Sequence, residues 1–188
     1  MYSIFYSVLL LFLSATSVLA SARIEDDWIS EPWDNLFVVV NQGNGEASSI
    51  GSYSLRVYRN NRDAFIDGRV DTRNGSIAGL WFADLDSDHN PEVCIWLENT
   101  GSGSYGELRV YTLEDAQLKQ IQLSEPSFRL TSGYRGHDEY TLQDGQIYRT
   151  FPLYRATDSM SEPTGGTTRL ILDFASRRWV ETGELSLQ

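Results

Sequence analysis

Alternation of apolar and polar residues with a period of two is the feature that most constrains how this chain can fold. It is clearest where Tyr53, Leu55 and Val57 alternate with their neighbours, which is the pattern of a strand with one buried face. No stretch shows sustained helical periodicity, and strand-like runs recur between turn residues along the chain. About ten such runs at close spacing predict an all-β fold, either a sandwich or a barrel of antiparallel sheets.

Several local signals refine this expectation. Residues 92–97 are nearly all apolar, which indicates a central strand buried on both faces. Asn74-Gly75 and Asp144-Gly145 stand between strand-like runs and are the strongest short hairpin signals. Residues 24–35 show no clear period and contain Pro32, so we expect an irregular lead-in there.

The N-terminal segment predicts export. Residues 1–22 carry no charged side chain, and residues 8–13 form an apolar run. Ala20-Ser21-Ala22 fits the small-x-small pattern that signal peptidase cleaves, so we expect cleavage after Ala20 or Ala22. The run is shorter than the roughly 20 residues of a membrane span, although an uncleaved anchor is the alternative. Residues 23–188 are then expected to form one periplasmic domain.

The charge balance and the single cysteine exclude several classes of protein. A formal net charge of −11 argues against nucleic acid as a partner and favours a basic one. Cys94 is the only cysteine, so no intramolecular disulfide can form, unlike in small disulfide-rich secreted domains. Because residues 93–96 are all apolar, we predict that Cys94 packs in the core.

An acidic turn before the apolar run is a candidate cation site. Oxygen-bearing side chains recur there at alternate positions, as a hard cation such as Ca²⁺ requires. The candidate ligands are Asp84, Asp86, Asp88, Asn90 and Glu92. His89 stands where such loops usually have glycine, so the favoured interpretation is structural, with aspartates hydrogen-bonding the local backbone. Ca²⁺ binding is the alternative.

Two glycine-containing loops carry side chains suited to binding a partner. Residues 100–106 hold three glycines, several hydroxyl groups and Tyr105, a composition typical of binding loops because tyrosine supplies rigid contact area. A plain hairpin loop is the alternative. The second loop, residues 132–138, offers possible flanking contacts, which are Tyr134, Arg135 and His137. His137 beside Asp138 could form half of an acid–base pair, but a structural histidine is the favoured interpretation.

Catalytic and cofactor motifs are missing from the sequence. It contains no G-x-S-x-G elbow, no Walker loop, no H-E-x-x-H pair and no G-x-G-x-x-G between a strand and a helix. We therefore predict no catalytic residues and no cofactor. An exported enzyme acting on glycans is kept as an alternative, because paired carboxylates leave no sequence signature among 26 acidic residues.

Three segments that follow one another in the chain resemble the periplasmic inhibitors of I-type (invertebrate) lysozyme. They are residues 50–58, residues 82–86 and Ser102-Gly103-Ser104-Tyr105. The last is similar to the S-G-x-Y loop associated with inhibition in that family. Residues 136–138, 151–154 and 163–167 extend the resemblance.

The resemblance implies a β-sandwich, here of about eight to ten strands, that inserts this loop into the active-site cleft of a lysozyme. Ser102 and Tyr105 are then the principal contacts, and Gly103 lets the backbone approach closely. A homodimer is a further expectation, because the family is often dimeric. Two alternatives stay open: inhibition of c-type lysozyme, whose inhibitors also use serine, glycine and tyrosine, and a calcium-binding structural or adhesion module.

Overall fold

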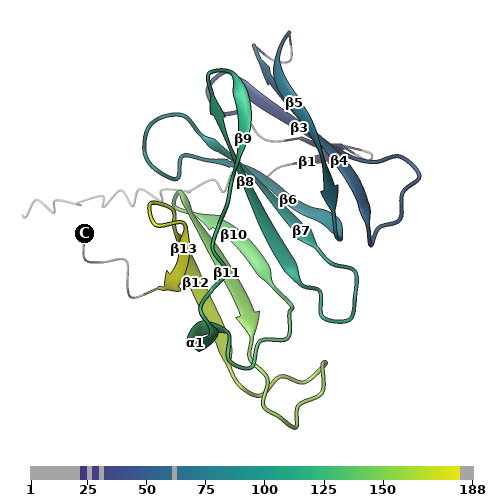
Figure 1. Cartoon of the computed structure of the whole chain (residues 1–188), viewed down its shortest axis with the longest axis vertical. Coiled ribbons are helices and arrows are strands. Elements are labelled where there is room, and N and C mark those ends of the chain that lie inside the picture. Colours follow the sequence, from purple (N-terminus) through teal and green to yellow (C-terminus); the bar gives the residue numbers. More distant parts are fainter. Residues whose placement is uncertain (1–21, 25–26, 30–31, 61–62, 183–188) are drawn as a thin grey trace, which may run out of the picture.

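The protein, described here by a computed structural model, consists of three antiparallel β-sheets (Figure 1). The structure describes residues 22–24, 27–29, 32–60 and 63–182. The predicted signal peptide, apart from Ala22, lies outside the described residues. No helix in the described part is long and apolar enough to cross a membrane. The prediction of an all-β antiparallel fold is confirmed.

Within each sheet, neighbouring strands are also consecutive in the sequence. The first sheet consists of β1 (Ala22–Ile24), β2 (Asp27–Ile29), β3 (Leu36–Gln42), β4 (Gly51–Arg59) and β5 (Ala64–Arg73). The middle sheet consists of β6 (Ser76–Ala83), β7 (Glu92–Glu98), β8 (Gly106–Glu114) and β9 (Gln117–Ile121). After the short helix α1 (Phe128–Thr131), the third sheet consists of β10 (Glu139–Gln143), β11 (Gln146–Pro152), β12 (Thr167–Asp173) and β13 (Arg178–Glu181).

The middle sheet is covered on both faces. Along β7, Val93, Ile95 and Leu97 point into a core shared with the first sheet. Cys94 and Trp96 point into a second core shared with the third sheet. This division explains the nearly continuous apolar sequence of β7, because alternate side chains enter different cores. A sandwich of two sheets is therefore extended here by a third layer.

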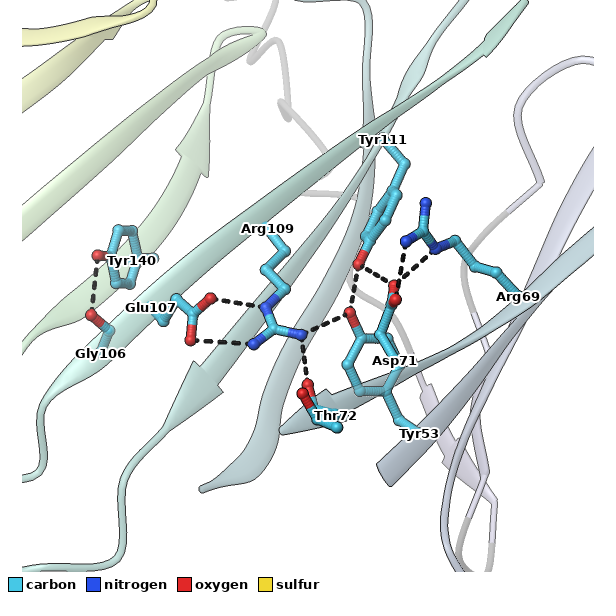
Figure 2. Close-up of polar contacts among 9 residues, drawn as sticks. All are labelled: Tyr53, Arg69, Asp71, Thr72, Gly106, Glu107, Arg109, Tyr111 and Tyr140. Carbon is cyan, nitrogen blue, oxygen red and sulfur yellow. Dashed lines mark hydrogen bonds and ion pairs between the residues drawn. The ribbon is translucent and has the colours of Figure 1, made fainter. Parts of the chain in front are cut away.

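Polar side chains join the first sheet to the middle sheet (Figure 2). The Tyr53 and Tyr111 hydroxyls hydrogen-bond each other across the interface, and Tyr111 donates to Asp71 at 2.8 Å. Arg69 donates to the other Asp71 oxygen at 2.7 Å. Burial acts to raise the pKa of Asp71, but the hydrogen bonds from Arg69 and Tyr111 outweigh it and lower the pKa overall. Arg109 reaches the Tyr53 hydroxyl at 3.2 Å, so the network spans both sheets.

Of the two predicted hairpin turns, the structure contains one and places the other between two sheets. Asp144 and Gly145, with φ of 52° and 75°, join the directly paired strands β10 and β11, as a type I′ hairpin requires. The prediction of a hairpin at Asn74-Gly75 is wrong, because β5 pairs with β4 and β6 pairs with β7. Of these two residues Gly75 alone has a positive φ, and the turn carries the chain from the first sheet to the middle sheet.

The described residues contain thirteen strands, more than the sequence indicated. The expected irregular lead-in, residues 24–35, holds β2 and the last residue of β1, and each of these strands has three residues. A strand of that length is too short to show a period of two. Pairing of β2 with β3 supplies the hydrogen bonds that define it.

The burial of Cys94 leads to a testable prediction about its reactivity. The side chain is fully buried, and burial raises the pKa of its thiol, so thiolate is scarce and inaccessible. We expect no reaction of the native protein with a thiol reagent, and stoichiometric reaction after unfolding in guanidinium chloride. Rapid labelling of the native protein would contradict the placement of Cys94 in the second core.

Candidate functional site

The loop between β7 and β8 is a hairpin tip held by its own hydrogen bonds. The Asn99 N–H donates to the Tyr105 carbonyl at 2.9 Å, and the Ser104 N–H donates to the Gly101 carbonyl at 3.0 Å. The Asn99 side chain accepts from the Gly101 N–H at 2.7 Å. Ser104 has φ of 40°, in the left-handed region where the chain turns. The loop therefore has a defined backbone conformation despite its three glycines.

Ser102 and Tyr105 present free hydroxyl groups at this tip. Ser102 is exposed, and Tyr105 is 49% exposed. Within the described residues neither hydroxyl has a hydrogen-bond partner. The Tyr105 ring meets the Tyr134 ring edge-on, with centroids 5.6 Å apart. Both hydroxyls are available to a ligand, while the tyrosine ring is supported on one side.

The segment 133–138 lies directly against the loop. The His137 N–H donates to the Gly103 carbonyl at 2.6 Å. Gly136 has φ of 96°, and a Cβ on it would lie 1.9 Å from the Gly103 oxygen. Gly103 is itself buried, and a Cβ there would lie 2.4 Å from the Tyr105 ring. The close approach of the two backbones therefore requires glycine at position 136, whereas glycine at position 103 makes room for the Tyr105 ring.

The Asp138 carboxylate is the polar centre of this contact. Its fully buried side chain accepts from the Gly106 N–H at 2.8 Å, from Arg149 Nε at 2.7 Å and from the Tyr134 hydroxyl. Arg149 also donates to the Tyr134 hydroxyl at 3.0 Å. Tyr140 donates to the Gly106 carbonyl at 3.3 Å (Figure 2). A buried ion pair needs such additional hydrogen bonds to offset the loss of solvation, and here they come from both sides of the interface.

The three predicted flanking residues lie beside the loop, and their side chains differ in the contacts that hold them. Burial, and then the hydrogen bond to Asp138, raise the pKa of Tyr134, which keeps its phenol protonated as a donor. The Arg135 guanidinium lies 5.2 Å from the Tyr154 ring centroid and donates to two backbone carbonyls. His137 Nε2 is buried and has no hydrogen-bond partner among the described residues. Because Gly106, Tyr134 and Arg149 donate to the Asp138 carboxylate, Asp138 does not form an acid–base pair with His137.

The acidic turn between β6 and β7 is closed by its own side chains. Asp84 accepts from the Asp88 N–H at 3.1 Å and from the His89 N–H at 3.2 Å. Asp88 accepts from the Asn90 N–H at 2.7 Å. These contacts agree with the structural interpretation of the turn. Carboxylate oxygens of Asp84, Asp86 and Asp88 also lie within 4.8 Å of one another, so Ca²⁺ binding by them stays the alternative interpretation.

Glu92, the last candidate calcium ligand, lies inside the fold. The residue is 1% exposed and accepts from the Leu85 N–H at 2.9 Å. Burial, with smaller contributions from Asp86 and Asp88, raises the pKa of Glu92 to about 7. Glu92 does not belong to the cluster of carboxylates formed by Asp84, Asp86 and Asp88.

The Asp138–Arg149 pair was not predicted from the sequence. Asp138 stands out there only as the neighbour of His137, and no motif near Arg149 points to a partner. The available signal was the period of two along β11, where Ile147, Arg149 and Phe151 share one buried face. A charged residue at a core-facing position indicates a buried partner.

These features define a class of protein. It is an all-β protein that displays a short uncharged loop with free hydroxyls, among them those of Ser102 and Tyr105, held on a rigid hairpin and supported by a second segment. Loops positioned in this way by a rigid scaffold commonly carry binding functions.

Comparison with known proteins gives the family. The model of a family described as the periplasmic lysozyme inhibitor of I-type lysozyme matches residues 29–127, and the chain belongs to this family. The family's periplasmic location agrees with the export predicted from the N-terminal segment. The match includes the S-G-x-Y loop and ends before α1, so the third sheet lies outside it.

Two solved structures are similar to part of the chain. The periplasmic inhibitor of I-type lysozyme from Aeromonas hydrophila is 38% identical, over 47% of this chain and 78% of that chain, with a TM-score of 0.43. The Aeromonas hydrophila inhibitor in complex with Meretrix lusoria lysozyme is 40% identical, over 46% of this chain and 74% of that chain, with a TM-score of 0.43. No curated protein matches the chain.

The raised pKa of Glu92 predicts how stability depends on pH. The ordinary value is 4.5 and the folded value is about 7, so the folded state binds the proton more tightly than the unfolded state. The contribution of Glu92 to stability is complete below pH 4.5 and is lost as the pH rises through 7. The Glu92→Gln side chain stays neutral at both pH values. Between pH 4.5 and pH 8 we therefore expect the free energy of unfolding of the variant to rise by about 1–3 kcal/mol relative to that of wild type.

Urea unfolding of both proteins at pH 4.5 and pH 8 measures this difference. Glu139→Gln, at an exposed position at the start of β10, is the matched control. Its free energy of unfolding should equal that of wild type at both pH values. If the free energies of unfolding of Glu92→Gln and wild type change with pH in the same way, folding does not raise the pKa of Glu92.

Proposed function

We propose that this chain inhibits an I-type lysozyme by inserting the loop Ser102–Tyr105 into the active-site cleft of the enzyme. The observation that carries the proposal is the pair of free hydroxyls on Ser102 and Tyr105, displayed by a loop whose backbone is fixed. Membership of the inhibitor family and the reported complex of the Aeromonas hydrophila relative with a lysozyme support it.

The chemistry of a lysozyme cleft suits these side chains. A retaining glycosidase holds two carboxyl groups about 5 Å apart, and one of them is kept protonated. The Ser102 hydroxyl can donate to the ionised carboxylate and accept from the protonated one. Tyr105 has an apolar face and a polar tip, as a side chain that fills a sugar subsite needs.

The charge around the loop supports the same proposal. The chain has a formal net charge of −11, but residues 100–106 contain no ionised side chain. The Arg135 carbonyl lies against Gly103, while its guanidinium lies over the Tyr154 ring. A neutral tip avoids repulsion from a carboxylate-lined cleft, while the acidic remainder attracts a basic enzyme.

Inhibition of this kind needs no turnover. The loop holds no carboxylate, histidine or cysteine that could act as a nucleophile or general base. A preformed loop that occupies the cleft is sufficient, because it loses little conformational freedom on binding. The protein is therefore proposed to act as a stoichiometric inhibitor and not as an enzyme.

The class of lysozyme is tested by a cell-wall clearing assay. Residues 23–188 are titrated against purified I-type, c-type and g-type lysozymes. We expect loss of I-type activity with the other two unaffected, because the family match is to inhibitors of the I-type enzyme. Loss of c-type activity alone would keep the loop chemistry and change the target, and three unaffected enzymes would overturn the proposal.

The role of the loop is tested by truncating its two side chains. We expect Ser102→Ala and Tyr105→Ala each to weaken binding to the lysozyme by about 1–4 kcal/mol, as central interface residues do. Neither should alter the melting temperature by more than a few degrees, because both side chains are exposed. The measurements are isothermal titration calorimetry and thermal unfolding.

Matched controls come from the third sheet. Thr141→Ala removes an exposed hydroxyl from β10, and Tyr148→Ala removes a half-buried ring from β11. Both should bind like wild type. Full affinity of the Ser102→Ala/Tyr105→Ala double variant would exclude this loop as the inhibitory element.

A further inference from the structure

The part of the chain outside the family match contacts the part that carries the S-G-x-Y loop. The match ends at residue 127, whereas the contacts that support the loop come from the segment 133–138 and from β11. The loop therefore has a second layer of support beyond the hydrogen bonds of its own hairpin.

We infer that the segment 133–138, anchored to the third sheet through Arg149, acts as a brace that holds the inhibitory loop in its binding conformation, with Asp138 as the positioning residue. The inference rests on the proposed function, because it assigns the brace to the same loop. Asp138 is buried and is not proposed to touch the lysozyme. It acts through Gly106 and Tyr134, which adjoin Tyr105 in sequence and in space.

The three donors to Asp138 come from three parts of the fold. The Gly106 N–H belongs to the first residue of β8, directly after Tyr105, and fixes the backbone where the loop ends. The Tyr134 hydroxyl fixes the ring on which the Tyr105 ring rests. Arg149 supplies the compensating charge from β11. One carboxylate thus determines both the backbone and the side-chain support of Tyr105.

Arg149 is itself held in place by aromatic rings. Its guanidinium lies 5.3 Å from the Tyr134 ring centroid, 5.7 Å from that of Tyr140 and 5.5 Å from that of Phe151. Its side chain is 6% exposed. A cation enclosed in this way is a fixed counter-charge, so Asp138 has one favoured position.

A second contact fixes the opposite side of the loop. The Gly103 carbonyl accepts from the His137 N–H at 2.6 Å, one residue before Asp138. Gly136 permits this approach, since a Cβ on it would overlap the Gly103 oxygen. The segment 133–138 therefore contacts the middle of the S-G-x-Y motif and, through Asp138, its end.

A braced loop binds more tightly than a free one. Ordering a mobile loop and its side chains on binding costs conformational entropy, and a loop already held in the bound conformation avoids that cost. The position of the buried Asp138–Arg149 pair beneath the loop favours this role, because a buried ion pair contributes little net stability compared with apolar packing.

The test compares Asp138→Asn with Asp71→Asn. Asp71 is a suitable control because it also accepts from a tyrosine and an arginine (Figure 2). It lies between the first and middle sheets, whereas Asp138 lies between the middle and third sheets. Both variants are measured for inhibition of the I-type lysozyme, for melting temperature and for amide hydrogen exchange of the free protein. The exchange readout follows the amides of residues 101–106 and of His137.

We expect Asp138→Asn to raise the inhibition constant roughly tenfold and to accelerate exchange at Gly106 and His137. Asp71→Asn should lower the melting temperature by a similar amount and leave both loop readouts unchanged. Tyr134→Phe, which removes only the hydroxyl, provides a milder variant that retains the charge pair and should weaken inhibition in the same direction. Inhibition and loop exchange like wild type in Asp138→Asn and Tyr134→Phe would overturn the inference.

The design separates this inference from the proposed function. Hydrogen exchange is measured without lysozyme, so accelerated loop exchange in Asp138→Asn supports the brace even if wild type inhibits no lysozyme. If wild type inhibits the lysozyme and Asp138→Asn and Tyr134→Phe inhibit it as strongly as wild type does, the proposed function stands and the brace is excluded. If Asp71→Asn weakens inhibition as much as Asp138→Asn, the effect is general destabilisation and the brace is also excluded.

Discussion

Burial of the middle sheet on both faces is the constraint on which the rest of the structure depends. Its strands send alternate side chains into two cores, so neither face can be left open to solvent without exposing apolar surface. On the side away from the first sheet, Cys94, Leu108 and Val110 would be exposed to solvent without a further layer packed on them. Strands β10 to β13 provide this layer, and their docking also brings the segment 133–138 beside the β7–β8 hairpin.

Charge placement follows from that docking. Asp71 lies at the first interface between sheets and Asp138 at the second, and each accepts from a tyrosine and an arginine. Such groups are tolerated in a low-dielectric interior only when their hydrogen bonds are complete. They therefore specify how the sheets are aligned. At the second interface this alignment also places the backbone and the aromatic support of the S-G-x-Y loop.

Local patterns in the sequence predicted local structure well. The alternation at Tyr53, Leu55 and Val57, the type I′ turn at residues 144–145 and the position of the loop before β8 are all features that a few neighbouring residues determine. The role of Asn74-Gly75 was not predictable in this way, because a turn between two sheets and a turn within a hairpin share the same short sequence. The Asp138–Arg149 pair was missed because each charge becomes meaningful only when its distant partner is known.

The order of strands has a consequence for how this molecule reaches its native state. Each sheet is a meander whose hydrogen-bonded neighbours are adjacent along the chain, so the loops closed within a sheet are short and cost little entropy. Contacts between sheets, such as Gly106 with Asp138, join residues much further apart. Proteins rich in local contacts fold faster than those that depend on distant pairings. The pairings within each meander therefore cost less loop-closure entropy than the contacts that dock one sheet on another.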